Sequence, residues 1–91
     1  MDFGGALQAL KAGKRVGRVE WPDSTWLVLV PGSTIVVDGD RPLGQAAPHL
    51  VGHAVGYQPH IDKVRTDGAM EPWVPTHTAL LAGDWEIRFW A

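Results

Sequence analysis

The chain has 91 residues, of which 45% are hydrophobic and 20% charged, and its formal net charge is −2 at pH 7. These values predict one small globular domain over residues 1–91, and the charge argues against a nucleic-acid polymer or an anionic membrane as partner. The absence of cysteine excludes disulfides and cysteine nucleophiles, and the chain shows neither a signal peptide nor an apolar run near the roughly 20 residues that cross a membrane, which fits a cytoplasmic protein.

The first residues predict an amphipathic helix over about 3–12. Phe3, Leu7 and Leu10 recur at i, i+4 and i+7, the spacing that places side chains on one helix face. Gly13 follows as a natural stop, because glycine readily adopts the left-handed conformation that ends many helices.

Three strands are expected next. Residues 14–21 have a mixed character, whereas residues 25–30 are apolar on both faces, as in a strand at the centre of a sheet or beneath a partner subunit. Pro31 and Gly32 match the central positions of a type II turn. Residues 34–38 then return as a β-branched strand, so we predict a hairpin across that turn.

Residues 39–60 are rich in glycine, proline, alanine and histidine. We expect a long loop, in which a short helix near 45–51 is limited by Pro48. Loops of this length are uncommon in small domains and are often functional. We interpret this one as a lid or an interface arm.

The next stretch predicts a second hairpin. Residues 60–66 and 69–73 alternate as strands around Asp67-Gly68, a strong two-residue hairpin turn. Pro72 confines the second of these strands to a sheet edge or a strand end, because proline cannot donate to a ladder.

A short helix over 76–82 and a last strand over 84–90 complete the chain. The alternation of this strand predicts Trp85, Ile87 and Phe89 on the core face, and Glu86, Arg88 and Trp90 on the outer face. The order of elements predicts an α+β fold: a single small domain with a mainly antiparallel sheet, an N-terminal helix and a second short helix before the last strand.

Histidines offer only a weak metal motif. His49 and His53 have the i, i+4 spacing of metal ligands on a helix, and His60 follows. Pro48 and Gly52 make a helix there doubtful, and no acidic third ligand lies nearby in sequence. We therefore predict no metal and no cofactor.

Catalytic motifs are not recognisable either. His77 lies between two hydroxyls, Thr76 and Thr78, but sequence neighbours on a helix do not face each other. The sequence holds no G-x-S-x-G, phosphate-binding loop or dinucleotide fingerprint. We predict that the protein is not an enzyme.

Two features favour a nucleotide pocket. The helix start at Thr76 offers free backbone N–H groups, which attract anions, and nearby strands carry basic residues. Indoles close to turns can stack on bases. The basic residues are Arg15, Arg18, Lys63 and Arg65, and the indoles are Trp21, Trp26 and Trp73. The alternative is that all five tryptophans belong to the core or to a subunit interface.

The chain also resembles a known family of small phage and prophage proteins, the second Thoeris anti-defence family. The matching residues are Phe3-Gly-x-Ala6-Leu7-x-Ala-Leu10-x-x-Gly13-Lys14-x-Val16-x-Arg18-x-x-Trp21, Trp26-Leu-Val-Leu-Val-Pro-Gly-Ser33, Pro59-x-Ile61, and Thr66-Asp-Gly-x-x-x-Pro72-Trp73-x-x-Thr76-x-x-x-Leu80-Leu-Ala82-x-Asp84-Trp85. They cover both ends of the chain, and residues 39–58 carry none of them.

The resemblance implies a non-catalytic sponge in the cytoplasm of the infected bacterial host. Such proteins sequester a cyclic ADP-ribose isomer that a TIR-domain enzyme makes, and so block activation of the Thoeris effector. They form homo-oligomers, typically tetramers, with pockets at subunit interfaces. Some also bind cyclic dinucleotides at separate sites. The alternatives are a sponge for cyclic dinucleotides of a CBASS-type system, a homodimer in place of a homotetramer, and a structural phage oligomer without ligand.

Carried over to this sequence, the resemblance implies that an indole of Trp21 or Trp73 stacks on adenine. Thr76 and the helix start would hold phosphate or ribose, and Arg18 would neutralise phosphate. His77, Thr78 and Trp26 complete the expected ligand-binding set. The chain departs from the family pattern at Pro22, His77 and Ala79, which puts the identity of the nucleotide in question more than its class.

Overall fold

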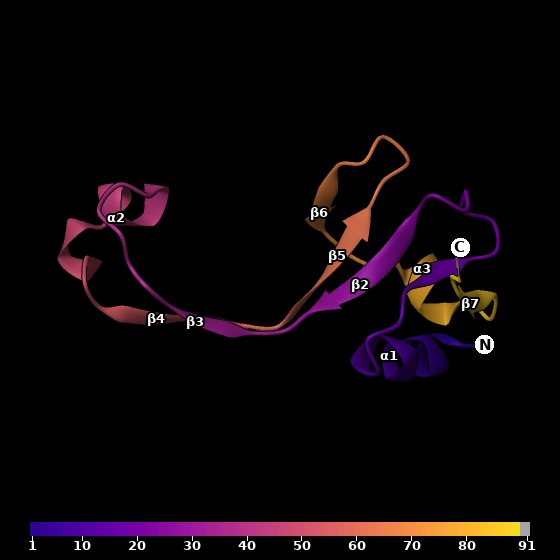
Figure 1. Ribbon diagram of the computed structural model, residues 1–91. Helices are drawn as coiled ribbons and strands as arrows, with labels where there is room; N and C mark the ends of the chain where they lie inside the picture. The colour runs from indigo at the N-terminus through magenta and orange to yellow at the C-terminus, as the bar shows by residue number, and fades with distance from the viewer. Residues whose placement is uncertain (90–91) are drawn as a thin grey trace.

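A computed structural model describes residues 1–89. Figure 1 shows a body that contains both termini and a long arm that leaves it. The elements in chain order are α1 (Phe3–Lys11), β1 (Val16–Arg18), β2 (Trp26–Val30), β3 (Ser33–Val36), α2 (Pro42–Ala46), a 3-10 turn (Pro48–Leu50), β4 (Ala54–Tyr57), β5 (His60–Val64), β6 (Met70–Pro72), α3 (His77–Leu81) and β7 (Trp85–Ile87).

The body is built on a five-stranded antiparallel sheet in the order β6-β5-β2-β1-β7. Helix α1 contacts β7, β2 and β1, and it also contacts α3. The predicted α+β fold is confirmed, including the N-terminal helix and the short helix before the last strand. Strand β2 lies in the middle of the sheet, as its two apolar faces predict.

Helix α1 buries one face, which is displaced from the predicted stripe: Ala6, Ala9 and Leu10 are buried, whereas Phe3 and Leu7 are only half-buried. Ala6 and Leu10 are buried in the core together with Leu27 of β2 and Trp85 of β7. The helix ends as expected, since Gly13 has a φ of 84° and its N–H donates to a helix carbonyl. The N-terminal ammonium of Met1 donates to the carbonyl of Trp85 at 2.7 Å, which holds the start of the chain against β7.

The predicted hairpin across Pro31-Gly32 is wrong. Strand β2 pairs with β5 and β1, and the chain continues past Gly32 into β3, which pairs with β4. Gly32 does not have a positive φ. A Cβ there would lie 2.8 Å from the carbonyl oxygen of Tyr57, so the glycine allows two backbones to pass closely where the arm leaves the body.

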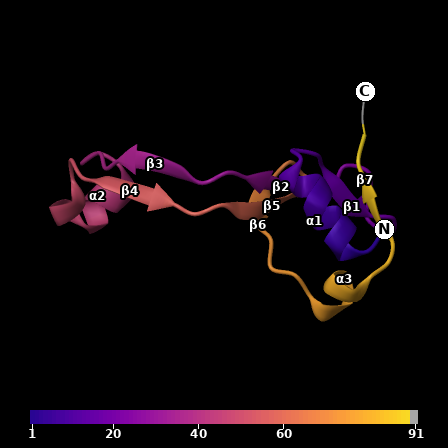
Figure 2. The same ribbon diagram turned by 90° about the horizontal axis from the view of Figure 1, so that it is seen from below.

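The predicted loop over 39–60 is also wrong in its main feature. Most of it has regular structure: α2, the 3-10 turn and β4. The expected helix near 45–51 is replaced by two short pieces, and Pro48 begins the second. With β3, these residues make the arm, residues 33–57, which projects from the body in both Figure 1 and Figure 2.

The arm makes the molecule elongated. Its radius of gyration is 16.4 Å, against about 12 Å for a compact chain of this length. The principal extents are 46 × 29 × 26 Å. The β3–β4 ladder is a separate two-stranded sheet, and every residue of β3 is exposed. An isolated two-stranded hairpin is only marginally stable in water, so the ladder alone contributes little to the stability of the arm.

The hairpin of β5 and β6 is confirmed, but its turn has three residues instead of two. The backbone N–H of Arg65 donates to the carbonyl of Ala69, and the N–H of Gly68 donates back to the carbonyl of Arg65. Gly68 has a φ of 85°, the left-handed residue that closes a three-residue loop. Pro72 lies on the edge strand β6, as predicted.

The alternation predicted for the last strand fails after Ile87. Arg88 is only 7% exposed, whereas Phe89 is 80% exposed, which reverses the expected faces. The cause is polar: the Arg88 guanidinium donates to the backbone carbonyls of Arg18 and Trp21, and it pairs with Asp23 at 2.9 Å. The prediction for Trp90 lies outside the described residues.

Candidate functional site

Four aromatic rings from different parts of the chain meet around Trp85 of β7. Trp85 is at the centre and only 1% exposed. The rings of Trp21 and Trp73 stand edge-on to it, with centroids 5.3 and 5.8 Å away and interplanar angles of 80° and 82°. Phe3 contacts Trp73 and Trp85 from α1. These contacts fix the orientation of the two outer indoles, which are half-buried.

The two outer indoles line one cavity of about 340 Å³. Its wall comes from β1, β5, β6, α3 and their connections, and consists of Arg18, Trp21, Lys63, Glu71, Pro72, Trp73, Val74, Thr76 and Ala79. Four of the seven residues predicted to bind ligand therefore come together: Arg18, Trp21, Trp73 and Thr76. Ligand pockets in proteins measure about 300–1,000 Å³, so this cavity lies near the lower end of that range.

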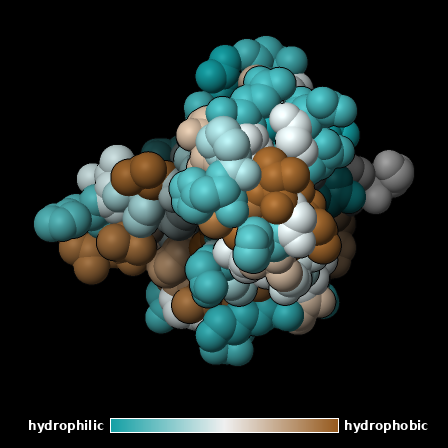
Figure 3. Space-filling view, turned by 90° about the vertical axis from the view of Figure 1, so that its left-hand side faces the viewer, coloured by the Kyte–Doolittle hydropathy of each residue, from teal (hydrophilic) through white to brown (hydrophobic). Residues whose placement is uncertain are grey.

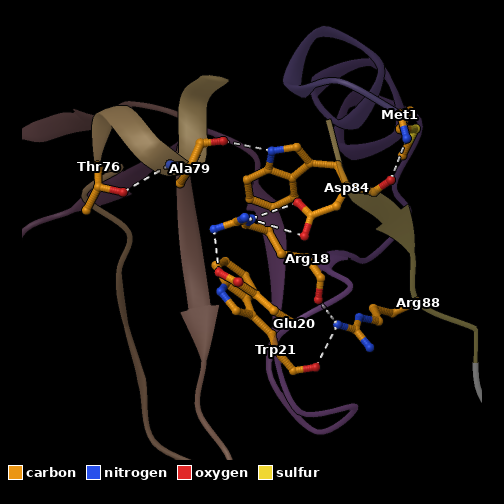
Figure 4. Close-up of polar contacts among 9 residues, drawn as sticks. Met1, Arg18, Glu20, Trp21, Thr76, Ala79, Asp84 and Arg88 are labelled. Carbon is orange, nitrogen blue, oxygen red and sulfur yellow. Dashed lines mark hydrogen bonds and ion pairs between the residues drawn. The ribbon is translucent and has the colours of Figure 1, made fainter. Parts of the chain in front are cut away.

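Arg18 is held by two carboxylates, as Figure 4 shows. Its Nε donates to Asp84 Oδ1 at 2.8 Å, and its Nη1 lies 2.6 Å from Glu20 Oε1. The hydrogen bond to Asp84 raises the pKa of Arg18 and lowers the pKa of Asp84. Because its charge is already matched, Arg18 can position a ligand by hydrogen bonding, but it is a poor candidate for the main phosphate-neutralising cation.

Thr76 caps α3. Its Oγ1 accepts a hydrogen bond from the N–H of Ala79 at 3.1 Å, which satisfies one of the free donors that an anion would use. Helix α3 has only five residues, so its dipole is small. The hydroxyl proton of Thr76 is still available, and this makes the side chain a hydrogen-bond donor at the cavity wall.

Three predicted residues do not line this cavity. Trp26 is on β2, where the guanidinium of Arg15 lies 4.9 Å from its ring centroid. His77 and Thr78 are exposed on the first turn of α3. Their position one and two residues beyond the cap turns them away from the wall that Thr76 and Ala79 form.

Sequence reasoning missed several groups around the cavity. Glu71 lines it from β6, and Asp84 and Glu20 fix Arg18 from two different connections. Glu71 lies in the second strand of the predicted hairpin, so its position opposite Lys63 follows from the strand register once the turn length is known. The Arg18–Asp84 pair joins residues 66 positions apart, and no local pattern signals it.

The fold does not bring the candidate histidines together as metal ligands. His49 belongs to the 3-10 turn and His53 lies beyond it, while His60 Nε2 is 3.5 Å from Asp62. Among residues 1–89, no group of three His, Cys, Asp or Glu side chains is placed to hold a metal ion. No helix in the same range is long and apolar enough to cross a membrane.

A family model for the Thoeris anti-defense 2-like domain matches residues 1–88. The chain belongs to the Thoeris anti-defense 2-like domain family. The match spans the whole described body and the arm, and it confirms the resemblance that the motifs indicate. Membership in the Thoeris anti-defense 2-like domain family supports a role in countering Thoeris defence. A search among curated proteins returned no match to the chain.

Proposed function

We propose that this protein is a non-catalytic sponge that binds a cyclic ADP-ribose isomer made by a TIR-domain enzyme, and so keeps it from the Thoeris effector in the host cytoplasm. The observation that carries the proposal is the cavity between Trp21 and Trp73, two indoles held in fixed orientation by Trp85. A base that stacks on a fixed indole gains roughly 1–3 kcal/mol. Rigid rings lose little conformational entropy on binding, which favours tight capture.

Polar groups at the cavity wall suit the rest of such a ligand. The Thr76 hydroxyl can donate to a ribose or phosphate oxygen, and the Arg18 guanidinium, which Asp84 and Glu20 hold in place, forms one wall of the cavity. Glu71 supplies an acceptor for a ribose hydroxyl on the opposite side. These groups bind and orient; Thr76 Oγ1 is engaged as a helix cap and is not paired with a base, which fits storage of the ligand better than its cleavage.

We also propose that the protein acts as a homo-oligomer, a homotetramer or a homodimer. The arm exposes large apolar side chains on an otherwise unsupported hairpin: Ile35, Val36, Val51 and Tyr57. The body exposes a second apolar set beside the cavity, namely Val74, Leu80 and Leu81. Figure 3 shows hydrophobic groups at the surface on the side that bears the arm. A second copy that covers these surfaces would stabilise the arm and enclose the small cavity further.

A second candidate ligand has the same chemistry. A cyclic dinucleotide of a CBASS-type system also combines bases with phosphates. Two residues that depart from the family pattern, Pro22 and Ala79, line cavities at this end of the molecule. The alternative, a structural phage oligomer without ligand, explains the exposed arm but does not explain the cavity.

The test is a capture-and-release experiment. Purified protein is mixed with a cyclic ADP-ribose isomer, separated from free nucleotide by filtration, and then heated. The proposal expects depletion of the free nucleotide and release of the intact molecule on heating. Release of a cleaved product would identify an enzyme, and no depletion of cyclic ADP-ribose isomers or cyclic dinucleotides would favour the structural reading. The Trp73→Ala variant should deplete at least tenfold less.

A further inference from the structure

A second cavity of about 510 Å³ lies next to the first. Its walls include Pro22, Thr25, Arg65 and Thr66, from the connection before β2 and from the end of β5. The two cavities share two lining residues, Trp21 and Lys63. They are therefore two lobes of one surface depression, with Lys63 at the boundary.

Lys63 is placed at this boundary by its strand and by an indole. It is on β5, paired across the sheet with Leu27 and Glu71. Its Nζ lies 4.6 Å from the centroid of the Trp21 ring, a cation–π contact that holds the ammonium between the lobes.

Of the basic residues that line the two lobes, Lys63 is the one whose charge remains available to bind an anion. Arg65 pairs with Asp67 and lies 3.8 Å from Glu71, and Asp62, the third carboxylate of this hairpin, lies 3.5 Å from His60 Nε2. Arg18 is matched by Asp84 and Glu20. Within residues 1–89, Lys63 has no ion-pair partner of its own.

Hydroxyl groups line the second lobe. Thr25 Oγ1 and Thr66 Oγ1 lie 3.1 Å apart, and Ser24 Oγ donates to Thr66 Oγ1 at the same distance. Thr25 is buried, so this small hydroxyl cluster has a fixed position. Such groups suit the hydroxyls of a ribose better than a second aromatic base.

We propose that Lys63 binds the phosphates of a nucleotide that spans both lobes, with the base in the Trp21–Trp73 lobe and a ribosyl half in the Thr25–Thr66 lobe. This inference rests on the proposed function and assigns its phosphate contact. It requires a ligand whose phosphates lie between a nucleoside and a ribosyl half. Arg18 then acts as a positioning residue that fixes one wall.

The test compares Lys63→Met with Lys63→Arg and with the matched control Lys11→Met, which removes an exposed lysine from α1. The probes are the cyclic ADP-ribose isomers, and adenosine as an uncharged base. Lys63→Met should weaken binding of the charged probes by about tenfold or more and flatten the salt dependence of their affinity. Its adenosine affinity should stay within twofold of wild type. Lys63→Arg should recover most of the binding, and Lys11→Met should behave like wild type.

Unchanged affinity and salt dependence in Lys63→Met would overturn the inference, and so would an equal loss for adenosine. If the wild-type protein binds none of the charged nucleotides, the proposed function fails, and Lys63 is judged by inorganic pyrophosphate alone. The indole N–H resonance of Trp21 should then shift on titration in wild type and Lys11→Met but not in Lys63→Met. No shift in the wild type would overturn the inference as well.

Discussion

The indole N–H of Trp85 donates to the backbone carbonyl of Ala79 at 2.9 Å. This buried bond ties the last strand to α3, the short helix that carries Thr76 at the cavity wall. Trp85 also orients Trp21 and Trp73 through edge-on contacts. Trp85 therefore fixes the positions of three residues of the cavity wall, Thr76, Trp21 and Trp73. A substitution of Trp85 should then change both the stability of the fold and its affinity for ligand.

Trp85→Phe tests that coupling. The variant keeps an aromatic ring but removes the donor to Ala79, which leaves a buried carbonyl with a poorer partner. We expect a loss of about 1–3 kcal/mol in the free energy of unfolding, measured by urea denaturation. Trp26→Phe is the control, because its half-buried indole contacts Arg15 and should lose less than about 1 kcal/mol. Equal effects of the two substitutions would contradict this account.

Gly17→Ala probes the buried guanidinium of Arg88. A Cβ at Gly17 would meet Arg88 Nε and Nη2, and the guanidinium is fixed by Asp23 and by two carbonyls. Overpacking of this kind is expected to destabilise by about 1–3 kcal/mol. Gly56→Ala in β4 is the matched control, since nothing lies within 4 Å of its added Cβ. A neutral Gly17→Ala would show that Arg88 moves freely.

Asp84 should contribute to the acid sensitivity of the protein. The hydrogen bond from Arg18 lowers the pKa of Asp84 below its usual value near 3.8. A carboxylate with a lowered pKa stabilises the fold above that usual value, and the contribution is lost as pH falls toward the folded-state pKa. The wild-type urea midpoint should therefore drop as the pH falls below the usual value near 3.8. Asp84→Asn should be less stable at pH 6 and show a shallower drop; an identical pH profile would contradict the role of the pair.

The arm predicts a concentration-dependent assembly. Val36→Asp places a charge on β3, where the native side chain is 67% exposed in one chain and is expected to be covered by a second copy. We expect a smaller mass than wild type in sedimentation equilibrium. Val19→Asp is the control, because Val19 is 61% exposed on the body. A wild-type protein that is monomeric at micromolar concentration would refute the arm as an interface.

Local patterns predicted most of the body. The i, i+4, i+7 stripe of α1, the two-faced apolar run of β2 and the Asp67-Gly68 turn each reflect interactions between neighbours in sequence, and each is confirmed in kind. The regular structure of the arm was missed because its order comes from pairing β3 with β4 across α2, not from local propensity. A Pro-Gly pair usually forms a turn. In this chain, Gly32 of the pair instead allows two backbone segments to pass close to each other.

The site was predictable in its aromatic part and not in its charged part. Trp21, Trp73 and Thr76 stood in motifs that the family resemblance singled out, and the fold brings them to one cavity. The state of Arg18 depends on Asp84, which only the sheet order places beside it. The burial of Arg88 could not be predicted either, because two of its partners are backbone carbonyls, which any sequence provides, and Asp23 is 65 positions away.

Thermal unfolding with a nucleotide panel tests the central claim most directly. Wild type and Trp73→Ala are each melted with cyclic ADP-ribose isomers, cyclic dinucleotides, NAD and ADP-ribose. A ligand at 100 times its dissociation constant stabilises the fold by about 2.7 kcal/mol, which is a rise in Tm of roughly 10–20 °C for a domain of this size. The account predicts such a rise with a cyclic nucleotide and not with NAD, and its near loss in Trp73→Ala. No rise with any nucleotide, or an equal rise in Trp73→Ala, would contradict it.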